Sequence, residues 1–264
     1  MAMEIRGGYS GTCGGARGAG LARDRVEAEE IVVIVRVGDS DHAPEDPCCP
    51  ASPDVSDHAA YDYYRSVIEK NGGTMTRHGA TVLGIRGESV DGYVHDTASL
   101  PRYDDTMVVL GEDRSVRIFP MTTHPAQKTS TQAPGGAVGE IAPGSFIARP
   151  HGLHDGLPSY HLLNPDGSGD LAGWRDYNHD GVIDASEKAR SEANHDTLTW
   201  ILIHGSKRLD VPTSIGCQVL SPSNQEQFIA AVGGKNAEFN YTLIDAHDVP
   251  GGGVLLPAPD LFGG

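Results

Sequence analysis

From residue 81 onward, short apolar runs alternate with turn residues, and this pattern limits the possible folds more than any other feature. We expect strands at residues 81–86, 106–110, 115–120, 145–149, 159–163, 197–203 and 240–245, with an earlier strand at 30–37. The chain also holds 34 glycines and 17 prolines, which suits a β-rich domain with many turns. The spacing of the runs predicts a sandwich or a barrel-like sheet.

Two amphipathic helices are expected among these strands. The first carries apolar residues at three- and four-residue steps and ends at a glycine pair: Tyr61, Tyr64, Val67, Ile68, then Gly72 and Gly73. The second begins with a capping box of Ser223 and Glu226 and stops at Gly233. Its apolar face consists of Phe228, Ile229 and Val232.

The 264 residues include 36 acidic and 20 basic side chains, giving a formal charge of −16. Such acidity argues against nucleic acid or an anionic membrane as the main partner. No apolar run approaches the roughly 20 residues that a membrane helix needs, so no membrane insertion is expected. The N-terminal residues lack the pattern of a secretory signal, and the localisation stays open.

One acidic stretch fits the twelve-residue EF-hand calcium loop at its diagnostic positions. The expected ligands are Asp176, Asn178, Asp180, the carbonyl of Val182, Asp184 and Glu187. Gly181 stands where the backbone must turn sharply, and a helix is expected over residues 186–193. The segment before the loop is too short and glycine-broken for an entering helix. We therefore expect one inserted loop holding a structural Ca²⁺, and no organic cofactor; the alternative is an Asx-turn loop without metal.

A histidine and a cysteine suggest nucleophilic chemistry. An apolar run leads to His204, and after twelve intervening residues Cys217 ends the turn Ser214-Ile215-Gly216-Cys217. A thiol becomes a useful nucleophile when a neighbouring base takes its proton, and histidine is the usual base. The alternative is that Cys217 is a buried, inert thiol.

This stretch resembles the catalytic motif of the L,D-transpeptidase (YkuD-type) family, in a divergent Ser-x-Gly-Cys-Gln branch. The resemblance covers roughly residues 80–246 and implies Cys217 as nucleophile and His204 as general base, with Ser214 and Gly216 in the catalytic turn. Two positions depart from the family pattern: Ile215 replaces a second histidine, and Val219 replaces an Arg or Asn.

The resemblance implies a chain that is mainly β with a few helices (α+β), an L,D-transpeptidase-like β-sandwich with an inserted calcium loop. It divides the chain into an N-terminal extension (1–75), a catalytic domain (76–250) and a tail (251–264). The implied activity is hydrolysis or transpeptidation of peptidoglycan stem peptides through a thioester on Cys217. We expect His154, Tyr160, Arg175 and Gln218 to contact the substrate.

Two other functions compete with this interpretation. His151, His154 and His161, with His124 or His195, offer nitrogen ligands for the zinc of a peptidase. Alternatively, the chain is a non-catalytic, calcium-stabilised module of a cell wall or phage, and the missing second histidine favours this reading.

Overall fold

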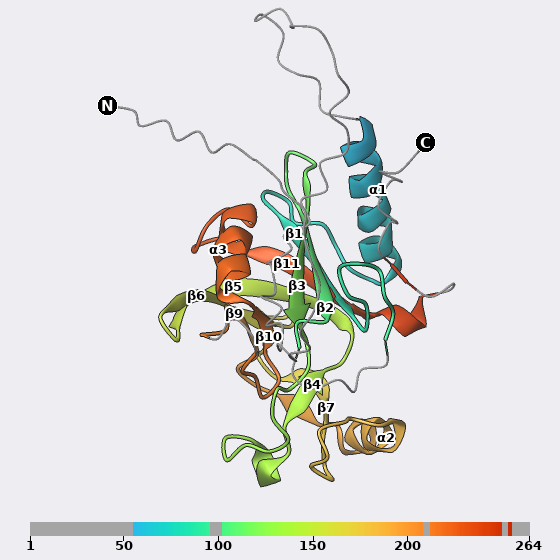
Figure 1. Cartoon of the computed structure of the whole chain (residues 1–264), viewed down its shortest axis with the longest axis vertical. Helices are drawn as coiled ribbons and strands as arrows, with labels where there is room; N and C mark the ends of the chain where they lie inside the picture. Colours follow the sequence, from blue (N-terminus) through green and yellow to red (C-terminus); the bar gives the residue numbers. More distant parts are fainter. Residues whose placement is uncertain (1–54, 96–101, 208–211, 250–252, 255–264) are drawn as a thin grey trace, which may run out of the picture. The chain divides into compact units, whose positions relative to one another are not determined.

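The computed structural model describes residues 55–95, 102–207, 212–249 and 253–254 (Figure 1). Every element below lies within Val32–Gly264. The expected strand at 30–37 and three cysteines, Cys13, Cys48 and Cys49, lie outside the described residues.

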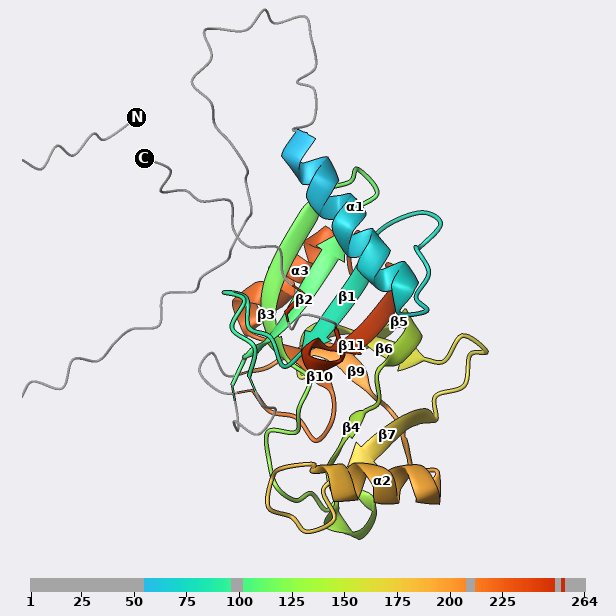
Figure 2. The ribbon, with the colours of Figure 1, turned by 90° about the vertical axis from the view of Figure 1, so that its right-hand side faces the viewer.

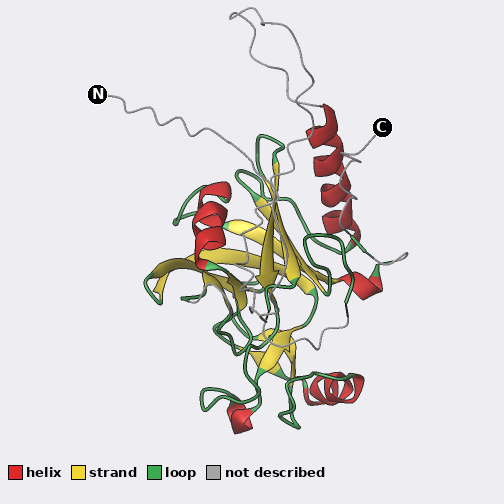
Figure 3. Cartoon of the chain, in the orientation of Figure 1, coloured by secondary structure: helices red, strands yellow, loops and turns green. Residues whose placement is uncertain are grey.

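Eight strands form one sheet that closes on itself as a barrel (strands are yellow in Figure 3). In order around the barrel they are β1 (Thr81–Arg86), β11 (Phe239–Asp245), β5 (Gly144–His154), β6 (Leu157–Leu163), β9 (Leu202–Gly205), β10 (Gln218–Leu220), β3 (Val116–Thr122) and β2 (Asp105–Leu110). The prediction of a mainly β fold with few helices is confirmed. The sheet is a closed barrel, which is one of the two arrangements that the spacing of the apolar runs predicts, and not the β-sandwich that the resemblance implies. It closes because β1 pairs in parallel with the distant β11.

A smaller sheet of three strands follows the order β4 (Gly139–Ile141), β7 (Leu171–Arg175) and β8 (Thr197–Leu198). A short 3₁₀ turn, Pro134–Gly136, precedes β4. Helix α2 (Ala185–Asn194) packs against β7 and lies beside it in Figures 1 and 2. The expected helix at 186–193 is thus present, and Asp184 with Glu187 forms its capping box.

The expected strand at 197–203 is broken in the middle. Residues Thr197 and Leu198 pair with β7 in the small sheet, whereas β9 belongs to the barrel. Trp200 lies at the break with a left-handed φ of 59°. An apolar run of this length is compatible with one continuous strand or with two strands in different sheets. The pattern alone therefore did not locate the turn at Trp200.

Helix α1 (Val55–Lys70) covers the outside of the barrel over β2 and β3 (Figure 2). Its Tyr64 and Ile68 are buried in a cluster with Leu83 and Ile85 of β1. The intervening Val82 points into the barrel and belongs to the inner core. Because β1 has a core on both faces, all its residues are buried, and the expected first helix is confirmed.

Helix α3 (Pro222–Ala231) places Phe228 in the inner core, where its ring meets Phe119 edge to face. The expected second helix is present, but it begins earlier than predicted: Ser221 is the N-cap, and the proline at the first helical position fits this start. A 3₁₀ turn, Ala246–Asp248, follows β11. No described helix is both long and apolar enough to cross a membrane.

A fully buried guanidinium connects the barrel to the small sheet. Arg86 of β1 donates to the carbonyl of Ile141 in β4 at 2.7 Å and to Oδ1 of Asp245 at 3.2 Å. Its Nη1 also lies 3.8 Å from Oε1 of Glu140, which is 2% exposed. Burial alone would raise the pKa of Glu140, but Arg86 and His124 outweigh it and lower the pKa to about 2.

Candidate active site

The turn that carries the cysteine is tied together by one hydroxyl. Ser214 Oγ accepts a hydrogen bond from the N–H of Gly216 at 2.9 Å and donates to the carbonyl of Cys217 at 3.0 Å. From outside, the N–H of Gly139 in β4 donates to the carbonyl of Ile215 at 3.2 Å. The turn is therefore fixed on both sides, and the predicted motif residues form one local structure.

Gly216 is required by a close approach of two backbone segments. Its φ is 150°, and a Cβ at this position would lie 2.6 Å from the carbonyl oxygen of Gly139. No side chain fits at that distance without moving β4 or the turn. The glycine of the motif thus sets the separation between the turn and the small sheet.

Cys217 is half-buried beside the start of β9. Its Sγ accepts the N–H of Leu202 at 3.4 Å, and its S–H donates to the carbonyl of Trp200 at 3.9 Å. Burial raises the pKa of the thiol to about 11, and the Leu202 N–H offsets only part of this rise. At neutral pH the thiol is therefore protonated.

His204 of β9 is 2% exposed, and its Nδ1 donates to the carbonyl of Gly205 at 2.9 Å. This bond fixes the tautomer in which Nε2 keeps a lone pair for a proton. Burial, with a smaller effect from the charge of His154, lowers the pKa of His204 to about 4. The imidazole is therefore neutral and in the form of a base.

The parallel pairing of β9 and β10 places the two groups on one side of the sheet. Gln218 lies opposite Ile203, and Val219 opposite His204. Because side chains alternate along a strand, Cys217 and His204 face the same way, away from Ile203 in the barrel core. Both line one cleft, yet no hydrogen bond joins the thiol to the imidazole.

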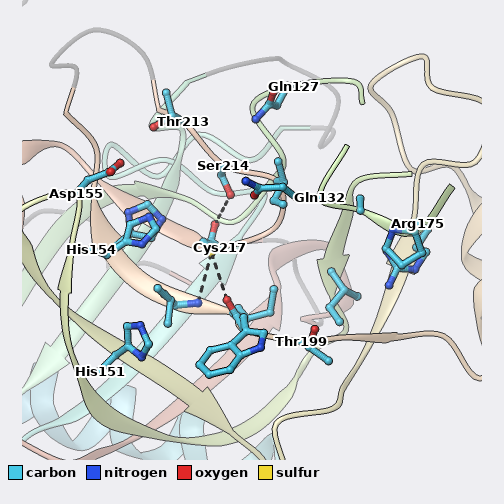
Figure 4. A pocket seen from close by; sticks show the side chains of 18 residues that line it. Gln127, Gln132, His151, His154, Asp155, Arg175, Thr199, Thr213, Ser214 and Cys217 are labelled. Atoms are coloured by element: carbon cyan, nitrogen blue, oxygen red, sulfur yellow. Dashed lines mark hydrogen bonds between the residues drawn. The ribbon is translucent and has the colours of Figure 1, made fainter. Parts of the chain in front are cut away.

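The cleft has a volume of about 620 Å³. Figure 4 shows His151 and His154 on one side of Cys217 and Arg175 on the other. The ring centroids of His154 and His204 are 4.3 Å apart. Several lining residues are not expected from the sequence, among them Gln127, Gln132, Trp200 and Thr213. Of these, only Trp200 had a sequence signal, since it opens the stretch that leads to His204.

Two of the four expected substrate-binding residues lie in the cleft and two do not. His154 and Arg175 line it, and the Arg175 guanidinium donates to the carbonyls of Ala137 and Thr197. Tyr160 and Gln218 are fully buried in the barrel and cannot contact a substrate in this structure. The Tyr160 hydroxyl donates to the carbonyl of Gly234, and Gln218 Oε1 accepts from Tyr241.

The acidic loop folds around its own backbone N–H groups. Asp176 accepts from Gly181, Asn178 from Asp180, Asp180 from Val182, and Asp184 from Ser186 and Glu187. Glu187, 5% exposed, accepts from the N–H groups of Tyr177, Asn178 and Asp184. Asp176 and Glu187 are buried, whereas Asn178, Asp180 and Asp184 are exposed. Oxygen donors of this kind suit a hard cation, and these residues with the Val182 carbonyl would hold Ca²⁺. Calcium binding stays a prediction.

The histidines suggested for zinc do not converge. His151 and His161 are ring neighbours with centroids 6.0 Å apart, whereas His154 lies against His204 and His124 donates to Glu140. In the part of the chain that the structure describes, the group of three metal-binding side chains within 4.8 Å of one another is His95, Asp104 and Asp105. None of these three lines the cleft.

No protein-family model and no curated protein matches this chain. Among solved structures, it is similar to a crystal structure of the helical cell shape determining protein Pgp2 from Campylobacter jejuni. The match has 16% sequence identity and a TM-score of 0.33 and covers 71% of this chain. It spans 56%, little more than half, of the length of that protein.

Proposed function

We propose that this chain is a cysteine-dependent acyltransferase or hydrolase that acts on peptidoglycan stem peptides, as its resemblance to L,D-transpeptidases implies. The observation that carries the proposal is the pair of Cys217 and His204 facing one cleft, with His204 held in the tautomer of a base by Gly205. The ordered Ser214–Gly216 turn supports the same assignment.

The first half of the reaction forms a thioester. As Sγ of Cys217 attacks an amide carbonyl carbon, its proton moves to Nε2 of His204, because neither group is charged at rest. The Cys217 N–H has no hydrogen-bond partner among the described residues, so it can donate to the oxyanion. The C–N bond then breaks, and the leaving amine takes the proton from His204.

The second half resolves the thioester. His204 removes a proton from water or from an acceptor amine, whose oxygen or nitrogen attacks the thioester carbonyl. The C–S bond breaks, and the proton returns to Cys217. Water gives a free carboxylate, and an amine gives a new peptide bond. A missing oxyanion donor costs about 3 kcal/mol in such reactions, so the turn matters nearly as much as the thiol.

One observation favours the non-catalytic alternative, a calcium-stabilised module of a cell wall or phage. The resting thiol is bonded to Leu202 and Trp200 and not to His204. For the enzyme, a substrate must therefore displace the thiol toward the imidazole. The enzyme would convert stem peptides, whereas the non-catalytic module would leave them unchanged.

The test is incubation with purified muropeptides bearing tri-, tetra- and pentapeptide stems, with Ca²⁺ present, followed by mass spectrometry. We expect shortened or exchanged stems with the wild type and none with Cys217→Ala or His204→Ala. His78→Ala is the control, because this histidine is 84% exposed and pairs with Glu112 outside the cleft. Unchanged stems with the folded wild-type protein would refute the enzyme.

A further inference from the structure

An exposed indole stands at the rim of the cleft in a backbone conformation that bulky residues seldom adopt. Trp200 is 66% exposed and has a φ of 59°. Left-handed backbone in a large L-residue is costly and persists where the surroundings impose it, often at a binding site.

Two histidines hold the indole in place. The ring of His161 is stacked on Trp200 with centroids 5.0 Å apart and an interplanar angle of 10°. His151 meets the indole edge to face at 5.8 Å. Burial, with a contribution from His151, lowers the pKa of His161 and favours its neutral form. His161 covers one face of the indole and does not itself line the cleft.

The supported indole lies directly beside the candidate nucleophile. Its own backbone carbonyl accepts the Cys217 S–H at 3.9 Å, and both residues line the same cleft. A ligand on the indole and a peptide at Cys217 would therefore occupy the same cleft.

We propose that Trp200, backed by His161, is a stacking subsite for a pyranose ring, the N-acetylhexosamine of the glycan to which the stem peptide is attached. The location of the peptide rests on the proposed function; the stacking surface does not. The face of an aromatic ring is weakly negative and attracts the weakly positive C–H groups of a sugar. A flat, rigid platform of two stacked rings matches a flat ligand.

An ammonium group fits this platform less well, although an indole face also attracts cations. The rings around Trp200 are those of His151 and His161, which add no negative charge. The carboxylate of the cleft, Asp155, is paired with Lys207 at 2.9 Å. A neutral sugar needs no such counter-charge.

The binding test uses the full chain carrying Cys217→Ala and oligomers of N-acetylglucosamine without peptide, followed by tryptophan fluorescence. Trp200→Gly is the main variant, since glycine accepts the left-handed backbone. Trp174, 8% exposed, remains as an internal reference. Tyr93→Ala is the matched control, because Tyr93 is 67% exposed and also stacked on a histidine but lies outside the cleft.

We expect a saturable change in fluorescence, binding about 10-fold weaker in Trp200→Gly by the usual value of aromatic stacking, and unchanged binding in Tyr93→Ala. Isothermal titration supplies the affinity of Trp200→Gly, which lacks the reporter indole. His161→Ala should weaken binding with the indole still present. No saturable signal, or a response to diaminopimelate but not to sugar, would overturn the subsite.

Sugar binding without conversion of muropeptides would leave this subsite standing and remove the proposed enzyme. Conversion of muropeptides without sugar binding would support the proposed enzyme and refute the sugar subsite. If both hold, Trp200→Gly should raise KM for disaccharide-linked stems about 10-fold and leave KM for the same peptides without sugar unchanged.

Discussion

The imidazole rings of His154 and His204 share one cleft with their centroids 4.3 Å apart. Two imidazoles this close do not both take a proton easily, and burial disfavours the charged form of His204 further. The contact with His154 therefore adds to the effect of burial and helps to lower the pKa of His204.

The first prediction concerns the pKa of His204. Its value of about 4 lies below the usual 6.5, so His204 stays neutral while the unfolded chain takes up a proton. Proton uptake by the unfolded chain favours unfolding. The free energy of unfolding should therefore be highest above pH 6.5, as far as His204 is concerned, and should decrease as the pH falls from 6.5 to 4. NMR titration of the imidazole should show His204 neutral at pH 5. In His154→Asn the pKa should rise, and titration near 6.5 in the wild type would contradict the buried base.

The second prediction concerns thiol reactivity. With a pKa of about 11, Cys217 should react with iodoacetamide slowly at pH 7 and about tenfold faster for each unit of pH up to about 10. His204→Ala should leave the rate at pH 7 unchanged. Peptide mass spectrometry separates Cys217 from the other three cysteines. A rate that is already maximal at pH 7 would mean an ion-paired thiolate and contradict the neutral pair.

The third prediction tests the contact between the catalytic turn and β4. Gly216→Ala should destabilise the fold by about 1–3 kcal/mol and abolish activity, because the new Cβ meets the Gly139 carbonyl. Gly79→Ala is the control, since Gly79 has a φ of 104° and nothing within 4 Å of its added Cβ. If urea unfolding shows the same loss of stability for Gly216→Ala and Gly79→Ala, backbone strain alone explains the loss and the contact with Gly139 does not contribute.

The same contact shows where sequence reasoning reached its limit. Local patterns located most strands, because apolar alternation and turn residues act over a few neighbours. The pairing of Gly139 with Ile215 joins segments far apart in the chain and leaves no local trace. Tyr160 was misplaced for a related reason: His161 faces outward, and a shift of one residue along a strand reverses the face. Gln218 was misjudged because a polar residue can be buried once Tyr241 bonds it.

The fourth prediction concerns calcium. A ligand that binds only the folded chain stabilises it by about 2.7 kcal/mol at 100 times its Kd, so EDTA should lower the Tm. Glu187→Gln should remove this dependence, because it takes away the bidentate carboxylate. Asp166→Asn is the control, since Asp166 caps an unrelated turn at Ser168. Identical melting curves with Ca²⁺ and with EDTA would rule out a stabilising ion.

The fifth prediction concerns the buried charges. Arg86→Met should cost about 3–5 kcal/mol, because it leaves Glu140 and Asp245 without their shared cation. The pKa of Glu140 should rise from about 2, so the stability that its ionised form contributes would disappear at a higher pH than in the wild type. Arg65→Met, at an exposed pair with Glu69, should change the stability by less than about 1 kcal/mol. Similar losses of stability in Arg86→Met and Arg65→Met would contradict a stabilising role for the buried ion pairs of Arg86.

The parallel pair of β1 and β11 also sets an order of assembly. Their paired residues Arg86 and Asp245 are 159 positions apart, so the ring of strands closes only after β11 has formed. Contacts of such long range make folding slow. Until β11 docks, β1 and β5 each lack one strand partner. Such open edges can pair with another chain, so we expect the risk of aggregation to persist after the Cys217 turn has been synthesised.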